Sequence, residues 1–348
     1  MSETMNVVAV VDDHKAQLVT VRKPQIKPGH VLMKINACAL CTWEQRVFTR
    51  ESKMPLPFVG GHEVAGEIAG VGEGVDQKEF PVGAKIVARL IHVCGKCYFC
   101  RRGEENLCLS MNDLDSSDMD IFGTGGLGEY LNLEPSQIYF IPSSMPDTKA
   151  VFAEPLACVL NSIERGQIEL GDDVVVIGGG IMGMLHVLCA KLSGARVIMS
   201  EPDPERRKLA EELGCDITVN PLETDPVEFI KGLTGGRGAE VVFNTTPISS
   251  VAAQAIAMVA PMGRVVMYSS QHPDKPIEVS PNWLHSSEAI ITGAVSPSVR
   301  SFNRSVNLLS KGMIDPSRLT SGVFPCTEAQ SAFEAAIRPD TFRIVVTF

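Results

Sequence analysis

The apolar residues of the first 150 positions fall into short runs that glycine and proline interrupt. Apolar runs of roughly four to eight residues between turn-forming residues are typical of β-strands. We therefore predict a β-rich, barrel-like unit over residues 1–150. The runs that support this prediction are Val31–Ile35, Val64–Ile68, Lys85–Arg89 and Tyr130–Leu133.

After Pro146 the pattern changes to alternating strands and helices. The run Asp173–Ile177 predicts a strand, and the spacing of apolar residues from Ile181 to Leu192 predicts a helix directly after it. Strands separated by helices of this length form a parallel, doubly wound sheet. This α/β pattern predicts a second unit over 151–288 and a C-terminal segment over 289–348, whose place the pattern alone leaves open. Further elements are predicted at Arg196–Ser200, Pro204–Leu213, Glu240–Asn244, Val251–Val259, Arg264–Ser269, Arg300–Ser310, Glu328–Ile337 and Arg343–Thr347.

Length and composition narrow the classes of protein to which the chain can belong. Its 348 residues are enough for about two domains, each with its own core. Lysine and arginine number 31 against 41 acidic residues, and the net charge of −10 argues against nucleic acid or an anionic membrane as partner. No apolar run is long enough to span a bilayer, and ten cysteines after a start without an export signal favour a cytoplasmic protein. The acidic stretch Asp113–Asp120 is predicted to be a solvated loop.

Four cysteines lie close together in the run VCGKCYFCRRGEENLC, with the spacing C-x2-C-x2-C-x7-C. Thiolates so close in sequence can surround one tetrahedral ion, and zinc is the ion that such a set favours. An iron–sulfur cluster is the main alternative, and a pair of disulfides is another. A site closed by four sulfurs has no open position for a substrate, so its role is structural. The predicted ligands are Cys94, Cys97, Cys100 and Cys108.

A glycine-rich motif lies where the first predicted parallel strand meets its helix. Residues 178–183 read GGGIMG and satisfy G-x-G-x-x-G in the strand–turn–helix context that gives this motif meaning. The turn brings backbone close to a pyrophosphate, and the N–H groups at the helix start bind phosphate. A glycine turn without a nucleotide is the alternative. The predicted cofactor contacts are Gly178, Gly180, Ile181, Met182, Gly183, Glu201 and Arg206, with Thr245 and Val295 at the ends of later strands.

The residue after the second parallel strand bears on the choice between NAD and NADP. Glu201 follows Gly178 by 23 positions and can accept hydrogen bonds from the adenosine ribose. Its charge would repel a 2′-phosphate, which favours NAD. Arg206 and Arg207 lie just beyond and are the observation that favours NADP.

A second set of metal-binding side chains lies outside the four-cysteine run. Cys41 precedes the sequence Gly61-His62-Glu63, and Glu154 opens the run EPLACV. One thiolate, one imidazole and one or two carboxylates can hold zinc with a position left open for a substrate. Each residue alone is more often part of a core or a surface, so the glycine context of His62 carries the prediction.

The residues around His62 resemble the signature of a known family. The run from Gly61 to Val75 fits the signature GHE-x2-G-x5-G-x2-V at every fixed position. With the four-cysteine run and the glycine motif, the whole chain resembles the zinc-dependent medium-chain dehydrogenases. The resemblance implies a GroES-like catalytic domain, a Rossmann domain, and a C-terminal segment that returns to the catalytic domain. It also implies two zinc ions per chain and a homo-dimer or homo-tetramer.

The same resemblance assigns roles to individual residues. Cys41 and His62 become ligands of a catalytic zinc, and Glu63 a ligand or one that exchanges with water. Glu154 takes the third-ligand position, where a Glu is similar to the sorbitol (polyol) dehydrogenase branch. Arg343 is implied to approach the pyrophosphate of the cofactor. The expected activity is NAD-linked oxidation of a polyol or sugar alcohol at a secondary hydroxyl. An L-threonine dehydrogenase and a non-catalytic zinc- and nucleotide-binding protein are the alternatives.

One position departs from the family pattern. The family usually has Ser or Thr two residues after the cysteine ligand, where its hydroxyl relays the substrate proton, followed by Asp. This chain reads Cys41-Thr42-Trp43-Glu44, and an indole cannot relay a proton. Thr42 or Glu44 could take over the relay, or a water held by Glu154 could carry the proton.

Overall fold

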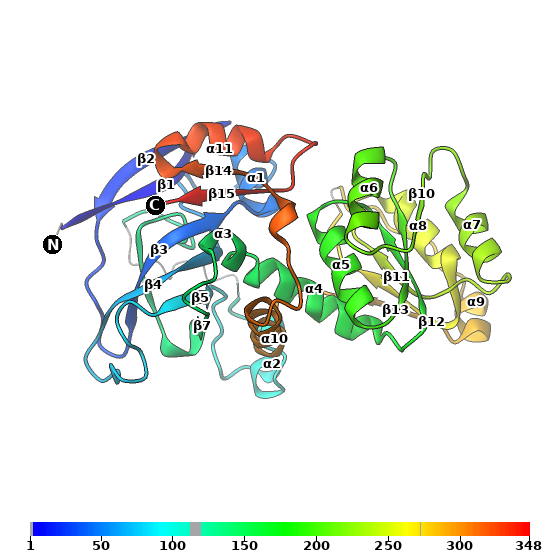
Figure 1. Cartoon of the computed structure of the whole chain (residues 1–348), viewed down its shortest axis with the longest axis horizontal. Helices are drawn as coiled ribbons and strands as arrows, with labels where there is room; N and C mark the ends of the chain where they lie inside the picture. The colour runs from blue at the N-terminus through cyan, green and yellow to red at the C-terminus, as the bar shows by residue number, and fades with distance from the viewer. Residues whose placement is uncertain (1–2, 112–119, 272) are drawn as a thin grey trace. The chain divides into compact units, whose positions relative to one another are not determined.

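The chain was analysed as a computed structural model that describes residues 3–111, 120–271 and 273–348. It divides into two compact units (Figure 1): unit 1 comprises Met1–Pro155 and Ser298–Phe348, and unit 2 comprises Leu156–Pro297. Residues 113–119 of the predicted acidic loop lie outside the described part of the chain. Among the described residues, no helix is both long and apolar enough to cross a membrane.

Unit 1 is rich in β-strands, as the short apolar runs predict, and all its strand pairs except β14–β15 are antiparallel. Its hairpin pairs β1 with β2, and its seven-stranded sheet has the order β14-β15-β3-β4-β5-β7, with β6 on β3. The strands are β1 (Thr4–Asp12), β2 (Lys15–Arg22), β3 (Val31–Ala39), β4 (Glu63–Val71), β5 (Lys85–Arg89), β6 (Tyr130–Leu133), β7 (Ile138–Phe140), β14 (Thr320–Pro325) and β15 (Arg343–Thr347). The helices are α1 (Thr42–Phe48), α2 (Tyr98–Arg101), α3 (Asp147–Ala150), α10 (Val299–Ser310), α11 (Ala329–Ala336) and the first residues of α4 (Ala153–Gly166).

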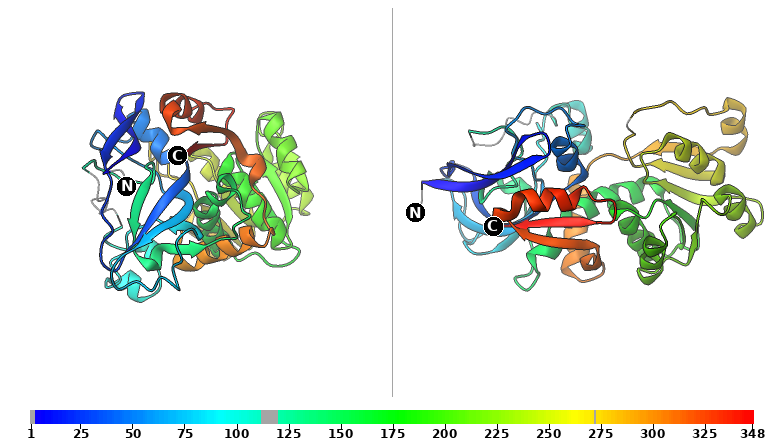
Figure 2. Two further views of the ribbon diagram at one scale, coloured as in Figure 1. Left: turned by 60° about the vertical axis from the view of Figure 1, so that its left-hand side comes forward. Right: turned by 90° about the horizontal axis from the view of Figure 1, so that it is seen from above.

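The last strand of the chain joins this sheet. β15 pairs in parallel with β14 and antiparallel with β3, so Val346 lies opposite Cys38. Figure 2 shows from two further sides that the C-terminal strands and α11 lie with the N-terminal strands of the unit. α11 buries Ala332 and Phe333 in the same apolar core as Phe48 and Phe58. The place that the hydrophobic pattern left open for the C-terminal segment is therefore in unit 1.

Unit 2 has the parallel, doubly wound sheet that the alternation predicts. Its six strands have the order β10-β9-β8-β11-β12-β13, with every pair parallel. The strands are β8 (Asp173–Ile177), β9 (Arg196–Ser200), β10 (Ile217–Val219), β11 (Ala239–Asn244), β12 (Val259–Met267) and β13 (Ile290–Gly293). The helices, besides the rest of α4, are α5 (Ile181–Leu192), α6 (Pro204–Glu212), α7 (Pro226–Leu233), α8 (Ser249–Met258) and α9 (Pro281–Ser287). Because β13 pairs with β12, residues 290–293 continue this sheet and are not part of a returning segment that begins at 289.

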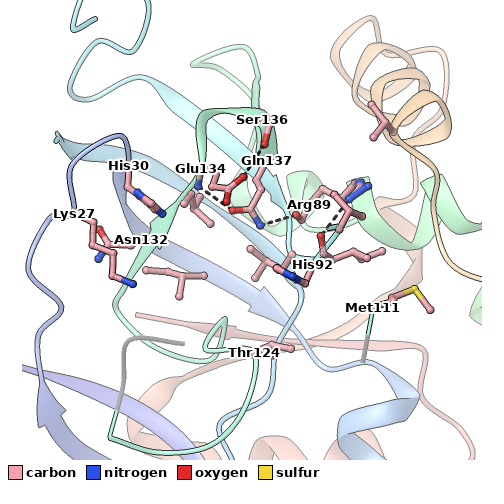
Figure 3. Close-up of a pocket in the computed structure, with 16 residues that line it drawn as sticks. Lys27, His30, Arg89, His92, Met111, Thr124, Asn132, Glu134, Ser136 and Gln137 are labelled. Carbon is pink, nitrogen blue, oxygen red and sulfur yellow. Dashed lines mark hydrogen bonds between the residues drawn. The ribbon is translucent and has the colours of Figure 1, made fainter. Parts of the chain in front are cut away.

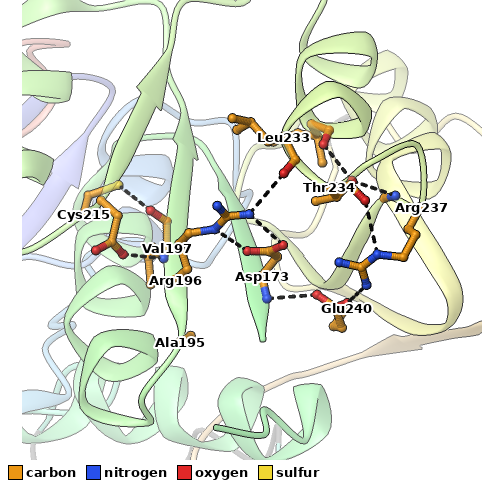
Figure 4. Close-up of polar contacts among 12 residues, drawn as sticks. Asp173, Ala195, Arg196, Val197, Cys215, Leu233, Thr234, Arg237 and Glu240 are labelled. Atoms are coloured by element: carbon orange, nitrogen blue, oxygen red, sulfur yellow. Dashed lines mark hydrogen bonds and ion pairs between the residues drawn. The ribbon is translucent and has the colours of Figure 1, made fainter. Parts of the chain in front are cut away.

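Charged side chains tie the N-terminal ends of neighbouring strands together in unit 2 (Figure 4). Arg196 at the start of β9 donates from Nε and Nη2 to the two carboxylate oxygens of Asp173, at 2.5 and 2.9 Å. The backbone N–H of Asp173 donates to Glu240 of β11, which also accepts from Arg237. These contacts lie at the end of the sheet opposite to the glycine turn, so they fix strand register away from the candidate cofactor site.

Candidate functional site

The four cysteines of the predicted structural site converge. The sulfurs of Cys94, Cys97, Cys100 and Cys108 all lie within 4.8 Å of one another, and all ten cysteines of the chain are free thiols. Backbone N–H groups donate to these sulfurs, from Cys94 to Cys108 at 3.2 Å and from Cys97 to Cys94 at 3.3 Å. Such N–H groups favour the thiolate, and those of Cys100 and Leu109 lower the pKa of Cys97 to about 6. The loop thus fits a tetrahedral ion held by sulfur.

A second convergent set of donor atoms lies where β3 ends and β4 begins, at the ends of two inner strands of the unit 1 sheet. Donor atoms of Cys41, His62 and Glu63 lie within 4.8 Å of one another. Cys41 follows β3 and is the N-cap of α1, while His62 and Glu63 stand where β4 begins. Pairing of β3 with β4 places Ala39 opposite Glu63 and so brings the two segments together. Sulfur, imidazole and carboxylate form a mixed donor set that fits zinc.

Glu44 holds this set in place from the third position of α1. Its Oε1 lies 3.0 Å from His62 Nδ1 and accepts from the Gly61 N–H at 2.9 Å, while its Oε2 accepts from the Cys41 N–H at 3.1 Å. The side chain is only 1% exposed. Both oxygens are therefore engaged in positioning the metal-binding loop. Glu44 is not placed as a proton relay, contrary to one of the routes considered from the sequence, because it orients the imidazole and leaves Nε2 available to a metal.

The negative charge of Glu44 and the positive charge of a protonated His62 stabilise each other. Burial would lower the pKa of His62, but the Glu44 carboxylate and the Cys41 sulfur raise it well above its usual value. Burial would likewise raise the pKa of Glu44, but His62 and the Gly61 N–H lower it. A buried, ionised Glu44 thus favours a His62 whose Nδ1 carries a proton.

Glu63 forms a buried ion pair with Arg343 of β15. The Glu63 side chain is fully buried and its Oε1 accepts from Arg343 Nη2, while Nη1 of the same arginine donates to the Leu40 carbonyl at 3.3 Å. Burial raises the pKa of Glu63 to about 7, although Arg343 lowers it. Glu63 Oε2 has no hydrogen-bond partner among the described residues, which suits an oxygen that faces a metal. Arg343 is 2% exposed and paired with this carboxylate, and its approach to a pyrophosphate, implied by the resemblance, stays a prediction.

Glu154 lies beside this set but not within it. The residue stands in the first turn of α4 and is 7% exposed. Its charge contributes to the raised pKa of Glu63, which places the two carboxylates near each other. The start of α4 is anchored by the Ser305 hydroxyl, which donates to the Ala153 carbonyl at 2.7 Å. Glu154 can thus serve the metal or a water next to it.

Trp43 occupies the place where the family usually has a hydroxyl. Its ring packs edge-on against Phe58 at 5.3 Å and against His62 at 5.9 Å between centroids. Thr42 begins α1 and is exposed. Sequence reasoning missed Thr124, whose hydroxyl donates to the Gly61 carbonyl at 2.7 Å and fixes the loop before His62. Its position in the run GTGGLG is the only local signal for that role.

The glycine turn of unit 2 has the close contacts that its motif predicts. Gly178 has a φ of +100°, and a Cβ on Gly183 would lie 1.8 Å from the Gly178 carbonyl oxygen. The Thr245 hydroxyl donates to the carbonyls of Ile177 at 2.8 Å and Gly178 at 3.2 Å, so Thr245 supports the turn from behind. Gly180 is the N-cap of α5 and offers no side-chain cap, which leaves the N–H groups of Ile181 and Met182 available to phosphate.

Glu201 and Arg206, the charged residues predicted near the cofactor, lie beside the same glycine turn. Glu201 is 5% exposed, and its carboxylate accepts from the N–H groups of Gly179 at 2.5 Å and Asp203 at 2.9 Å. A Cβ on Gly179 would lie 3.2 Å from the Cβ of Arg206, so Arg206 also starts beside the turn. Val295 lies further along the chain, is 51% exposed, and accepts from Asn161 through its carbonyl at 3.2 Å.

Comparison with known proteins agrees with both units. Residues 27–143 match the alcohol dehydrogenase GroES-like domain, and residues 182–311 match the zinc-binding dehydrogenase family. The chain is 35% identical over 274 residues to an L-threonine 3-dehydrogenase from Pyrococcus horikoshii, covering 76% of each chain. It is 27% identical over 343 residues to a sorbitol dehydrogenase from Bacillus subtilis, covering 97% of this chain and 94% of that one.

Among solved structures, a protein from Sinorhizobium meliloti assigned as a zinc-binding dehydrogenase and bound to NADP superposes with a TM-score of 0.90. It is 27% identical, and the match covers 100% of both chains. The predicted combination of a GroES-like and a Rossmann domain is thereby confirmed. With the extent of these matches and two convergent zinc-type donor sets, the chain belongs to the zinc-dependent medium-chain dehydrogenase/reductase family.

Proposed function

We propose that this dehydrogenase oxidises a secondary alcohol of a polyol or sugar alcohol to a ketone and passes the hydride to NAD. The observation that carries the proposal is the convergence of Cys41, His62 and Glu63 within 4.8 Å, with Glu154 beside them. The sorbitol dehydrogenase relative covers nearly the whole chain and supports the substrate class. Carboxylates near the metal also suit a substrate that offers several hydroxyl groups.

In this proposal the chain holds two zinc ions, one in each donor set. Cys41 Sγ and His62 Nε2 hold the catalytic ion, with Glu63 or Glu154 completing the set. Bound there, zinc supplies positive charge that lowers the pKa of an alcohol, and a nicotinamide nucleotide accepts the hydride. Glu44 keeps the imidazole in one orientation by its hydrogen bond at 3.0 Å. Arg343 opposes the rise in the pKa of Glu63 and fixes the position of its carboxylate.

The proton of the alcohol needs a route that avoids Trp43. An indole N–H only donates, and both oxygens of Glu44 are engaged. We assign the proton to a water held by Glu154, with the Thr42 hydroxyl as the alternative. A Glu154→Gln variant separates the two, since an amide cannot take up the proton. The water route requires turnover to fall and its alkaline pH dependence to change, whereas Thr42→Val should leave both unchanged.

NAD is proposed over NADP because of Glu201. Its buried carboxylate lies against the glycine turn, where it would oppose the charge of a 2′-phosphate. Arg206 beside the turn and the NADP in the Sinorhizobium meliloti structure favour the other cofactor. The ratio of kcat/KM with NAD to kcat/KM with NADP decides between them. A ratio below one would overturn the choice of NAD.

An amino alcohol is the second candidate for the substrate. It is favoured by the 35% identity to L-threonine 3-dehydrogenase, which exceeds the identity to the sorbitol enzyme but extends over less of the chain. The deciding assay measures NAD reduction with a panel of sugar alcohols, vicinal diols and L-threonine, before and after zinc chelation. Activity with sugar alcohols supports the proposal, and activity confined to L-threonine selects the alternative. Turnover unaffected by removal of the catalytic zinc would refute the metal mechanism itself.

Assembly and location are also part of the proposal. β13 is an edge strand of the unit 2 sheet with Ile290 40% exposed, and an unpaired edge of this kind can pair with a second copy. We therefore propose a homo-dimer or homo-tetramer, to be checked by light scattering of the purified protein. Ten free cysteines support a reducing, cytoplasmic location.

A further inference from the structure

A groove in unit 1 borders the four-cysteine loop, since Val93 of its lining directly precedes Cys94, but it is lined by other residues than the candidate zinc ligands. It has a volume of about 370 Å³, within the range of small-molecule sites, and its described lining includes none of the candidate zinc ligands. Figure 3 shows Lys27, His30 and Asn132 on one side of the groove and Arg89, His92 and Met111 on the other. The groove lies along β5, β6 and the segment between β5 and the four-cysteine loop.

The charges that line the groove are mainly positive. Lys27 and Arg89 carry positive charge, and the polar rings of His30 and His92 line the same groove. Glu134 is the one carboxylate in the described lining, and it accepts from the Ser136 hydroxyl at 3.4 Å. The chain as a whole has a net charge of −10, so this balance is the reverse of the average along the chain. A groove lined in this way attracts small anions.

Arg89 is the residue that makes the groove unusual. It is 3% exposed, and one of its nitrogens, Nη1, donates to the Ile91 carbonyl at 3.3 Å. Nε and Nη2 have no hydrogen-bond partner among the described residues. Burial lowers the pKa of this guanidinium, and the charges of Tyr139, Glu105 and Cys100 offset only part of the effect. A buried cation with two unpaired N–H groups is costly unless an acceptor reaches it.

The two unpaired nitrogens form the edge of the guanidinium that binds oxyanions in pairs. The protein uses this edge elsewhere, since Nε and Nη2 of Arg196 hold both oxygens of Asp173 (Figure 4). Nε and Nη2 of Arg338 hold Asp340 in the same way, at 3.1 and 2.6 Å. In Arg89 the equivalent edge faces no described carboxylate. A carboxylate or phosphate has the geometry to fill it.

We propose that this groove is a binding site for a small metabolite that carries a carboxylate or phosphate group. The Nε and Nη2 edge of Arg89 supplies the buried positive charge, and Lys27 at the exposed rim supplies the attraction that draws the anion in. Because both nitrogens are covered, the anion reaches them after the side chains over the guanidinium shift, and until then it is held by the field of the buried charge.

The experiment titrates the zinc-loaded full-length protein with inorganic phosphate and, separately, with succinate, by calorimetry at constant ionic strength. The proposal expects saturable binding of at least one of the two, with one site per chain. Arg89→Met should weaken it at least about tenfold, the loss expected for a charge-assisted pair. Lys27→Glu should weaken it several-fold, whereas Lys78→Glu, an exposed lysine of the same unit outside the groove, should leave it unchanged. The phosphate and succinate arms tell which oxyanion the site prefers.

A fallback and one further variant, His62→Ala, keep the result decisive. If Arg89→Met does not fold, the surface variant Lys27→Glu decides in its place. His62→Ala removes a ligand of the proposed catalytic zinc, and the anion should still bind to this variant. Loss of binding in His62→Ala would place the anion on the catalytic metal and overturn the proposal. Absence of saturable binding, or equal binding by the wild type, Arg89→Met and Lys27→Glu, would overturn it as well.

Discussion

Replacement of Glu44 by glutamine tests whether this carboxylate positions the catalytic metal ligands. Glu44 accepts three hydrogen bonds, from Gly61 and His62 at Oε1 and from Cys41 at Oε2. A glutamine has the same shape but only one accepting oxygen. Whichever way its amide is turned, at least one buried donor loses its partner, and the negative charge beside His62 is lost as well.

The size of the effect follows from these contacts. A buried donor left without a partner costs about 1–3 kcal/mol. Loss of a carboxylate that orients a ligating histidine typically weakens metal binding about 10- to 100-fold. We therefore expect Glu44→Gln to bind zinc at the Cys41–His62 site about 10- to 100-fold more weakly than the wild type.

The assay measures zinc per chain by mass spectrometry after dialysis against a series of chelator-buffered zinc concentrations. The four-cysteine site serves as an internal reference, because it should keep its ion in the variant. Glu67→Gln is the matched control, since Glu67 stands on β4, the strand that begins at Glu63, and among the described residues it pairs with the half-exposed Lys34 at 3.3 Å. Equal zinc affinity of Glu44→Gln and wild type at the catalytic site would refute the reasoning.

Three more predictions address other parts of the molecule. Cys100→Ser should lower the zinc content by one ion per chain and make residues 94–108 sensitive to protease, and retention of both ions would argue against a four-sulfur site. Gly183→Ala should weaken NADH binding at least about tenfold in a fluorescence titration, because a Cβ there would lie 1.8 Å from the Gly178 oxygen and force the turn open; unchanged affinity would contradict this. Burial lowers the pKa of His186 to about 4, so the unfolded chain takes up this proton first and the wild type should lose up to about 3 kcal/mol of stability as the pH falls from about 6.5 to 4. Denaturant titrations at both pH values should show a smaller acid loss in His186→Asn, and an equal loss in both proteins would exclude His186 as its source.

Local sequence pattern was sufficient for most elements of the parallel sheet. The runs Asp173–Ile177 and Arg196–Ser200 and the helix Ile181–Leu192 have the predicted bounds in the structure, because strand length and helical spacing are local properties. The hairpin of β1 and β2 was not predicted, and its paired residues alternate between polar and apolar only from Thr4↔Arg22 to Val7↔Val19. Residues 290–293 were assigned to the wrong unit because a four-residue edge strand carries little pattern of its own.

The metal-binding side chains of the candidate site were predictable from the sequence, but the residues that hydrogen-bond to them were not predicted. Cysteine spacing and the glycine context of His62 indicated both donor sets. The role of Glu44 had a local signal, since it stands three residues after Cys41, the spacing at which a side chain reaches back to the N-cap. The pairing of Glu63 with Arg343 spans 280 residues and has no local signal at all. Its prediction depends on knowing that β15 pairs with β3.

The placement of β15 has a consequence for how the protein is made. Translation proceeds from the N-terminus, so Cys41, His62 and Glu63 leave the ribosome long before Arg343. Until Arg343 has been made, β3 lacks its neighbour β15 in the sheet and the Glu63 carboxylate lacks its cation. Unit 2 is complete in sequence by then and is free to fold during synthesis, whereas the metal-binding unit is completed only once β15 has been made.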